Sequence, residues 1–305
     1  MRRLRDIASL AQLAVLLEVS APKPGNVTPA KSFSDTTYVH FLASASALWS
    51  SALSAARRGW LAGRGRIKAE KVGLGELIKR AVRDTRRLHG GGNTLLGELM
   101  LLIPLCAAAG YAAGRSEPLR ASSLRRAAGV LINATTPEDA VQLYRAIRLA
   151  SPRLGRAERL DVFSRESEQE LLELGISMKQ VLSLSLHDSI ARELVLGYPL
   201  TFELALPALL EAYSRTGDLL RAAVECYLHV LAEVPDSLIE RKAGRAEAEK
   251  VSELARQVLA SGAGEGELER FDAYLRSRGN LLNPGTTADI TGACLFVALL
   301  TEVKP

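Results

Sequence analysis

The sequence predicts an all-α protein, a single compact multi-helix domain over residues 1–305 built around two central apolar helices. Strand alternation is absent, and so are the Asn-Gly and Asp-Gly turns that join hairpins. Apolar residues recur at helical spacing along most of the chain, and no composition shift marks a linker. Two runs, Leu95–Ala109 and Ile290–Leu300, are apolar on every side, which is typical of helices buried all round.

Helix boundaries follow from capping residues and helix breakers. Pro22 and Pro24 end the first helix within a polar loop, Ser20–Thr37, and loops of that length inside a compact chain are often functional. The basic, glycine-containing segment Arg57–Lys71 is interpreted as a surface turn, and Ser151–Gly155 as a loop. The expected helices, in chain order, are about Leu4–Val19, Tyr38–Ala56, Leu74–Leu88, Leu95–Ala109, Pro137–Leu149, Glu166–Leu174, Met178–Leu196, Glu203–Arg215, Leu219–Ala232, Ala246–Ala260, Glu265–Ser277 and Thr287–Glu302.

The first twenty residues imitate a secretory signal peptide, because three arginines precede an apolar stretch. Asp6, Ser9 and Gln12 interrupt that stretch and its apolar residues share one helical face, so we interpret it as an amphipathic helix. The run Leu95–Ala113 approaches the length of a membrane span, but Glu98 and many alanines fit a core helix better. We therefore expect a cytoplasmic protein without a membrane segment, in agreement with three scattered cysteines that lack metal-ligand spacing.

Composition limits the classes of partner. The net charge of +5 suits anionic ligands such as nucleotides but is too small to argue for nucleic acid by itself. Basic segments at Arg57–Lys71, at Arg115–Arg126 and before His89 allow a nucleic-acid hypothesis, yet they carry almost no aromatic residues for stacking on bases. Small molecules are the expected partners.

A glycine-rich loop, His89-Gly90-Gly91-Gly92-Asn93-Thr94, opens the first all-apolar helix. Three consecutive glycines allow positive φ and can bring several N–H groups to one point, and Asn93 or Thr94 is a suitable N-cap. A helix N-terminus reached in this way favours a phosphate or a carboxylate, although a plain tight turn explains the same residues. Walker A and Rossmann fingerprints are absent, which excludes the standard nucleotide-binding folds.

A second group of polar residues surrounds a proline-fixed turn. Lys23 stands between two prolines, with Glu18 before it and Gly25 and Asn26 after it. Because proline fixes φ, such a turn presents the lysine on a stiff loop, as a phosphate contact would require. The alternative is an ordinary exposed lysine on a turn.

The second all-apolar helix also starts at a glycine turn, Asn283-Pro284-Gly285. Thr286 and Asp289 have capping-box spacing, and a catalytic or metal-binding carboxylate is the competing interpretation of the aspartate. Asp236 follows Pro235, and capping of a helix that begins there is the structural explanation of this aspartate. If the two apolar helices pair in the core, their N-terminal loops would meet in one polar pocket.

Four segments, taken in order, resemble the triphosphoribosyl-dephospho-CoA synthase family. They are Glu18-Val19-Ser20-Ala21-Pro22-Lys23-Pro24-Gly25-Asn26-Val27, Gly92-Asn93-Thr94 with Gly97, Pro235-Asp236-Ser237 with Gly244, and Asn283-Pro284-Gly285-Thr286-Thr287-Ala288-Asp289-Ile290. The ordered set spans nearly the whole chain, from Glu18 to the last predicted helix.

The resemblance implies an all-α transferase that moves the triphosphoribosyl group of ATP to a hydroxyl of dephospho-CoA and releases adenine. Magnesium would accompany the triphosphate, with Asp236 and Asp289 as candidate ligands. Candidate catalytic residues are Glu18, Asp236, Asp289 and His89: a carboxylate as base, a carboxylate beside the oxocarbenium-like sugar, and the histidine as acid for the departing adenine. Candidate nucleotide-binding residues are Lys23, Gly25, Asn26, Gly90, Gly91, Gly92, Asn93, Thr94, Asn283, Gly285 and Thr286.

The chain departs from the family pattern at one motif. Where the family has His-Lys after Asn-Thr, this sequence has Leu95-Leu96, so the donor could be held differently or the activity changed. Other segments, among them Thr136–Ala140 and Asp161-Val162, resemble an archaeal-type branch, which could use another acceptor. A non-catalytic nucleotide-binding protein is the alternative from a different class. A homo-oligomer is compatible with the sequence.

Overall fold

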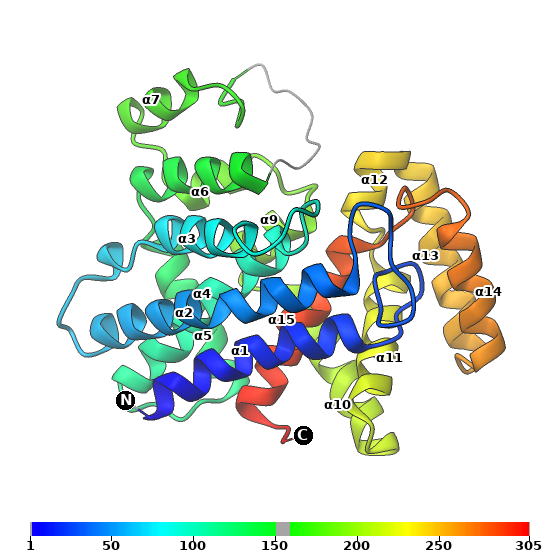
Figure 1. Ribbon diagram of the computed structural model, residues 1–305. Coiled ribbons are helices and arrows are strands. Elements are labelled where there is room, and N and C mark those ends of the chain that lie inside the picture. The colour runs from blue at the N-terminus through cyan, green and yellow to red at the C-terminus, as the bar shows by residue number, and fades with distance from the viewer. Residues whose placement is uncertain (1, 151–158, 305) are drawn as a thin grey trace.

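The computed structural model describes residues 2–150 and 159–304, and every regular element in these ranges is helical, which confirms the all-α fold (Figure 1). The expected loop at 151–155 lies outside the described residues. The elements are α1 (Arg2–Ser20), α2 (Tyr38–Gly63), η1 (Ala69–Lys71), α3 (Leu74–Arg86), α4 (Leu96–Gly114), α5 (Ala121–Asn133), α6 (Pro137–Ala150), α7 (Glu166–Glu173), α8 (Met178–Ser183), α9 (Ser189–Leu196), η2 (Leu200–Ala205), α10 (Leu206–Thr216), α11 (Leu219–Glu233), α12 (Ser237–Ala243), α13 (Arg245–Ala260), α14 (Glu265–Arg276) and α15 (Gly285–Thr301).

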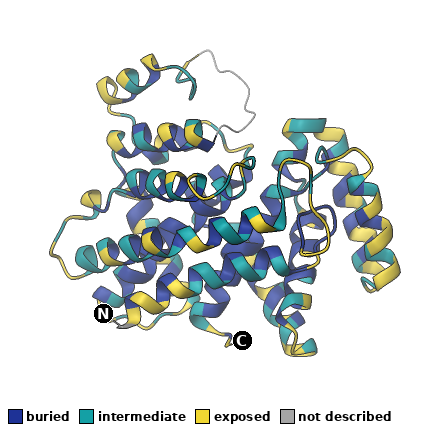
Figure 2. Cartoon of the chain, in the orientation of Figure 1, coloured by how far each residue is buried: buried dark blue, intermediate teal, exposed yellow. Residues whose placement is uncertain are grey.

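The helices form a layered bundle around α4 and α15. In Figure 1, α1, α2, α3 and α6 lie one above another, and α12, α13 and α14 form the opposite side of the molecule. Helix α4 packs against α2 and α5, while α15 packs against α1, α4 and α11. Figure 2 shows buried residues concentrated along the inner helices, so the two all-apolar runs form the centre of the core as expected.

Helices α2 and α4 approach closely because glycines lie at their crossing. A Cβ on Gly59 of α2 would overlap the carbonyl oxygen of Ala107, and a Cβ on Gly110 of α4 would overlap that of Ala56. This contact also explains why α2 continues to Gly63 instead of ending near Ala56, since its last two turns pack on α4. The expected surface turn is therefore shorter than Arg57–Lys71.

Several other elements differ from expectation: the short helix α12 was not among the expected helices, and the expected helix Glu203–Arg215 is divided into the π-helix Leu200–Ala205 and α10. Helix α5 was not predicted, because the sequence analysis interpreted Arg115–Arg126 only as a basic segment. In the structure Leu124 and Leu131 are buried on the inner face of this helix. The expected helix Met178–Leu196 is divided into α8 and α9. The Asp188 side chain accepts hydrogen bonds from the N–H groups of Ile190 and Ala191 and so starts α9.

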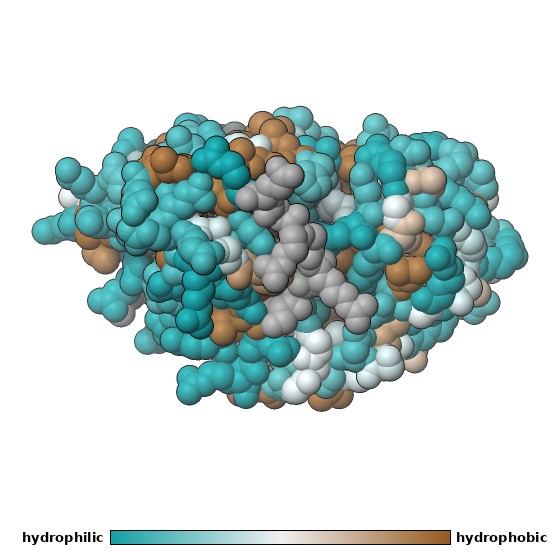
Figure 3. Space-filling model, turned by 90° about the horizontal axis from the view of Figure 1, so that it is seen from above, coloured by the Kyte–Doolittle hydropathy of each residue, from teal (hydrophilic) through white to brown (hydrophobic). Residues whose placement is uncertain are grey.

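The hydrophilic surface and the burial of the most apolar helix both indicate that this helix belongs to the core. The face seen in Figure 3 is mostly hydrophilic, with hydrophobic residues in scattered patches. Among the described helices, Leu96–Gly114 alone is long and apolar enough by itself to cross a membrane, and 78% of its apolar window is buried inside the protein. A second candidate arises only if α9 and Leu200–Thr216, bent by 90°, are counted as one span.

Candidate active site

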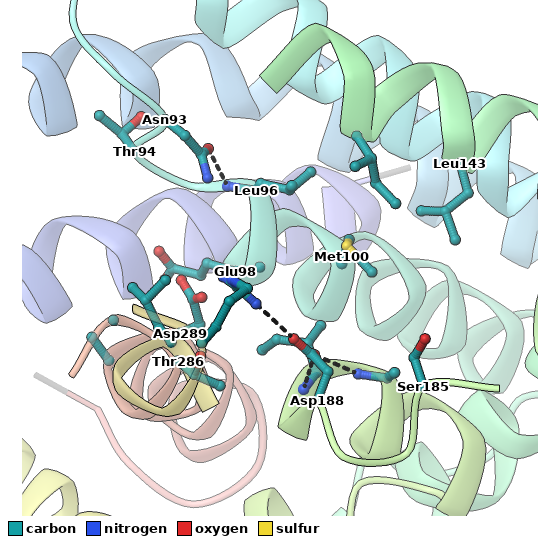
Figure 4. Close-up of a pocket in the computed structure, with 18 of the residues that line it drawn as sticks. Asn93, Thr94, Leu96, Glu98, Met100, Leu143, Ser185, Asp188, Thr286 and Asp289 are labelled. Carbon is teal, nitrogen blue, oxygen red and sulfur yellow. Dashed lines mark hydrogen bonds and ion pairs between the residues drawn. The ribbon is translucent and has the colours of Figure 1, made fainter. Parts of the chain in front are cut away.

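A cavity of about 490 Å³ lies where five helices begin. The starts of α2, α4, α9, α12 and α15 line it, together with the last turn of α1, parts of α6 and α8, and the loops around residues 26 and 161. The loops before the two apolar helices thus meet in one pocket, as the sequence suggested (Figure 4). Because helix N-termini carry partial positive charge, their convergence favours negatively charged groups in this cavity.

Three carboxyl groups line one end of the cavity: Glu18, Glu98 and Asp289. Burial raises the pKa of Glu98 well above its ordinary value, and the charges of Glu18 and Asp289 raise it further. Burial likewise raises the pKa of Asp289, with Glu18 as the next contribution. Oε1 of Glu98 has no hydrogen-bond partner among the described residues. The sequence analysis used Glu98 only as a charge that argues against a membrane span and did not place it among the site residues.

Helices α4 and α15 each place a carboxyl group against a glycine of the other. A Cβ on Gly97 would overlap Oδ2 of Asp289, and a Cβ on Gly292 would overlap Oε1 of Glu98. The backbone N–H of Glu98 also acts on the Asp289 carboxyl group and opposes the rise in its pKa. The glycines therefore allow both carboxyl groups to reach the cavity from tightly packed helices.

Lys23 lies behind this acidic end rather than on the cavity wall. Only 1% of its surface is exposed, and its Nζ is 3.0 Å from Oε1 of Glu18. The ammonium also donates to the backbone carbonyls of Glu18 and Ala21. Burial nevertheless raises the pKa of Glu18, an effect that Lys23 opposes. The structure thus places Lys23 against Glu18 rather than on the wall, where the stiff loop was expected to present it to a phosphate.

The turn after Lys23 is fixed by contacts with α14. Gly25 has φ of 72° and donates its N–H to Asp272 at 2.8 Å. Asn26 lines the cavity, and its Oδ1 accepts the N–H of Val27 at 2.7 Å. Residues 26 and 27 of the loop after α1 therefore form part of the cavity wall.

The glycine-rich loop contributes its last two residues to the site. Asn93 and Thr94 line the cavity, and Oδ1 of Asn93 accepts the N–H of Leu96 at 3.1 Å, which starts α4. Gly90, Gly91 and Gly92 are not among the lining residues, and none of them has positive φ.

The three glycines instead support the packing around the loop. Gly91 lies against the ring of His40, where a Cβ would overlap Nδ1, and Arg86 donates to the carbonyls of Gly91 and Gly92. The loop does not form the expected cradle of converging N–H groups.

His89 is connected to the cavity through a hydroxyl. Its Nε2 lies 2.9 Å from Oγ of Ser44, which lies 2.9 Å from Oγ1 of Thr94 on the cavity wall. The His89 ring stacks on His40 with centroids 5.1 Å apart. Burial lowers the pKa of His89, and the neighbouring charges of His40 and Arg86 lower it further. No local signal in the sequence pointed to Ser44.

Asp236 joins α12 to α15. Its Oδ1 accepts the N–H groups of Leu238 and Ile239, and its Oδ2 accepts the N–H and the hydroxyl of Thr287 at 2.7 and 2.8 Å. Burial raises the pKa of this carboxyl group, which these hydrogen bonds oppose. Asp236 is not among the residues that line the cavity, whereas Asn283, Gly285 and Thr286 are.

The described residues contain no group of three or more His, Cys, Asp or Glu side chains arranged to hold a metal ion. The described lining includes a single Arg or Lys, Arg241, whose Nη1 lies 3.3 Å from Oδ2 of Asp188. Neither residue of this pair was singled out as a site residue. A polyanion in the cavity would therefore need further neutralisation.

These features define a class, an all-α protein with a carboxylate-lined cavity at the paired starts of two buried helices. Residues 4–305 match the model of the CitG family, ATP:dephospho-CoA triphosphoribosyl transferase, and the chain belongs to this family. It is 29% identical over 114 residues to an Acinetobacter calcoaceticus protein with the name 2-(5''-triphosphoribosyl)-3'-dephosphocoenzyme-A synthase. That alignment covers 34% of this chain and 37% of the relative, so it spans little more than a third of the relative's length.

A solved structure supports the same family. The crystal structure of a candidate triphosphoribosyl-dephospho-CoA synthase from Archaeoglobus fulgidus aligns with a TM-score of 0.62 and 27% sequence identity. The alignment covers 84% of this chain and 99% of that chain.

Proposed function

We propose that the protein transfers the 5-triphosphoribosyl group of ATP to a hydroxyl acceptor, dephospho-CoA in the first instance, and releases adenine. Membership of the CitG family supports the reaction. The observation that carries the assignment to this cavity is the placement of Glu18 and Asp289 together on its wall, where a sugar carbon that loses its base could lie between carboxylates.

The reaction breaks the bond between adenine and C1 of the ribose and forms a bond from C1 to the acceptor oxygen. The acceptor hydroxyl must lose a proton, and the departing adenine must gain one. Asp289 is the proposed base, because it lines the cavity beside Glu18 and a raised pKa strengthens a carboxylate as a proton acceptor. Glu18 is the proposed electrostatic partner of the oxocarbenium-like sugar, since Lys23 fixes its position.

Mg²⁺ is proposed to enter with the triphosphate. Magnesium is commonly held by one or two carboxylates together with substrate phosphates. Asn283 has an amide oxygen that could contribute, and Asp289 could do so only in place of its role as base, whereas four hydrogen bonds already occupy the oxygens of Asp236. When bound, the ion would neutralise phosphate charge.

The pair Leu95-Leu96 bears on how the donor is held. Leu95 is 2% exposed and belongs to the core, while Leu96 lines the cavity. An apolar side chain thus faces the ligand space where the family resemblance leads one to expect a basic residue. This supports an altered contact to the donor or acceptor, and the likeness to the A. fulgidus structure favours an archaeal-type branch. A reaction that uses ATP also supports a cytoplasmic setting.

The test is incubation of the purified protein with ATP, Mg²⁺ and dephospho-CoA, with adenine followed by chromatography and the adduct by mass spectrometry. Adenine together with triphosphoribosylated dephospho-CoA is the expected result. Adenine without that adduct would indicate another acceptor. ATP binding without adenine release would instead favour the non-catalytic nucleotide-binding alternative. Glu18→Gln and Asp289→Asn are the matched variants, and both should abolish adenine release if the assignment to this cavity is right.

A further inference from the structure

The cavity has a second, apolar end. Its lining there comes from α4, α6 and α8 through Met100, Leu143, Tyr144, Ile147, Val181 and Leu182, with Leu160 and Val162 beside them. Figure 4 shows Met100 and Leu143 on the side of the pocket away from Glu98 and Asp289. A single cavity therefore joins an acidic end to an apolar end.

The apolar wall is held in place by its own contacts. Ile147 lies four residues after Leu143 and three residues after Tyr144 on α6, so the three side chains share one helical face. The Tyr144 hydroxyl donates to the carbonyl oxygen of Leu160 at 2.6 Å, and burial raises the pKa of Tyr144 to about 12. Since the hydroxyl is already satisfied inside the wall, the tyrosine presents its ring rather than a polar group.

The apolar side chains at this end of the cavity suit one part of ATP, the purine ring, better than the triphosphate. A triphosphate placed against apolar side chains would lose its hydration without compensation, which is strongly unfavourable. The purine is uncharged, flat and largely apolar, and it is attached to the ribose carbon that the proposed reaction needs beside Glu18 and Asp289. The half-buried Ser185 lines the same cavity and adds a hydroxyl that can bond a ring nitrogen.

Resting on the proposed function, we propose that the apolar end formed by α4, α6 and α8 is the pocket for the purine ring of ATP, and that the triphosphate extends from the carboxylates toward the starts of α12 and α15. The leaving adenine then remains against an apolar wall while the acceptor oxygen approaches C1. In this arrangement the apolar end determines which nucleoside is accepted as donor and leaves the affinity for the acceptor unchanged.

The test uses Ile147, which lines the cavity and is only half-buried, so that a larger side chain can be accommodated by the fold. Ile147→Trp should fill the apolar end. The matched control is Leu149→Trp on the same helix, because Leu149 is 44% exposed and does not line the cavity. Calorimetric binding of adenosine and of inorganic tripolyphosphate is measured for the wild type and for both variants, with helical content and melting temperature recorded.

We expect Ile147→Trp to weaken adenosine binding at least tenfold, while Leu149→Trp leaves it unchanged and tripolyphosphate binds all three proteins alike. In turnover, the KM for ATP should rise in Ile147→Trp and the KM for dephospho-CoA should stay constant. The proposal is overturned if Ile147→Trp binds adenosine as tightly as the wild type. It is also overturned if both ligands weaken equally, or if the KM for dephospho-CoA rises instead.

The two proposals can fail separately. Adenosine lacks the triphosphate and is offered without an acceptor, so its binding is measured apart from transfer to dephospho-CoA. Adenosine binding that depends on Ile147, in a protein that releases no adenine from ATP, would refute the proposed function and leave the purine pocket in place. If the protein releases adenine from ATP but Ile147→Trp binds adenosine as tightly as the wild type, the purine pocket alone is refuted.

Discussion

Oδ2 of Asp289 occupies the space that a side chain on Gly97 would need. The two residues belong to α4 and α15, and the same pair of helices repeats the arrangement in the opposite direction with Glu98 and Gly292. Glycine at these positions is required by close approach, since neither Gly97 nor Gly292 has positive φ. The position of the cavity carboxylates therefore depends on the absence of two side chains.

Gly97→Ala should reduce adenine release at least tenfold, because the added methyl group must displace the Asp289 carboxylate. Gly129→Ala on α5 is the control, since a Cβ there meets nothing within 4 Å. Replacing that helical glycine should leave activity intact and stabilise the fold by up to about 1 kcal/mol. Wild-type turnover by Gly97→Ala would contradict the importance of this contact.

Glu98→Gln should flatten the pH dependence of stability. Burial raises the pKa of Glu98 in the folded state, so its stabilising contribution is complete at low pH and is lost as pH rises from about 4.3 toward the raised value. Urea unfolding across this range should give a variant more stable than the wild type at the alkaline end. Glu269→Gln, at an exposed position of α14, is the control for the loss of one carboxyl group. Equal slopes for Glu98→Gln and the wild type would be the contrary result.

Lys23→Met should lower the free energy of unfolding by about 3–5 kcal/mol at neutral pH, because it leaves the buried Glu18 carboxylate without its partner. Adding Glu18→Gln should recover part of that loss. Lys31→Met in the same loop removes an ion pair with Asp272 in which the lysine is 51% exposed, so it should cost less than about 1 kcal/mol. Equal losses from the two lysine variants in denaturant titrations would show that burial of the Glu18 pair matters little.

Asp236→Ala should lower the free energy of unfolding by about 2–4 kcal/mol, since it removes a helix cap and two bonds to Thr287. If Asp236 acts only by joining α12 to α15, adenine release per folded molecule should remain within a few-fold of the wild type. Activity is to be measured below the melting temperature of the variant. Complete loss of turnover in a folded variant would restore the catalytic role that the sequence suggested.

The sequence predicted the core well because apolar residues on every side of α4 and α15 leave burial as the only stable arrangement. The prediction of helix boundaries failed where contacts between distant helices determine where a helix begins or ends. The arginines of α5 concealed a helix whose buried face is short, and the last turns of α2 depend on glycine contacts with a helix more than forty residues away. Such approaches leave no periodic signal.

The site was predicted in part for a related reason. Residues next to glycine turns, such as Asn93 and Thr286, lie on the cavity wall as expected, because the turns lead into paired helices. Glu98 was missed since it interrupts an apolar run, and Ser44 since its partners are distant in sequence. Lys23 and Asp236 stand in recognisable motifs, yet both turn toward protein groups rather than the cavity.

The cavity draws Glu18 from the first helix and Asp289 from the last. During synthesis the site is consequently completed only after α15 has left the ribosome and packed against α4. A ligand bound there holds both ends of the chain, and at 100 times its Kd it would add about 2.7 kcal/mol to the stability of the whole fold. The stability of the fold should therefore rise with the concentration of any ligand that fills this cavity.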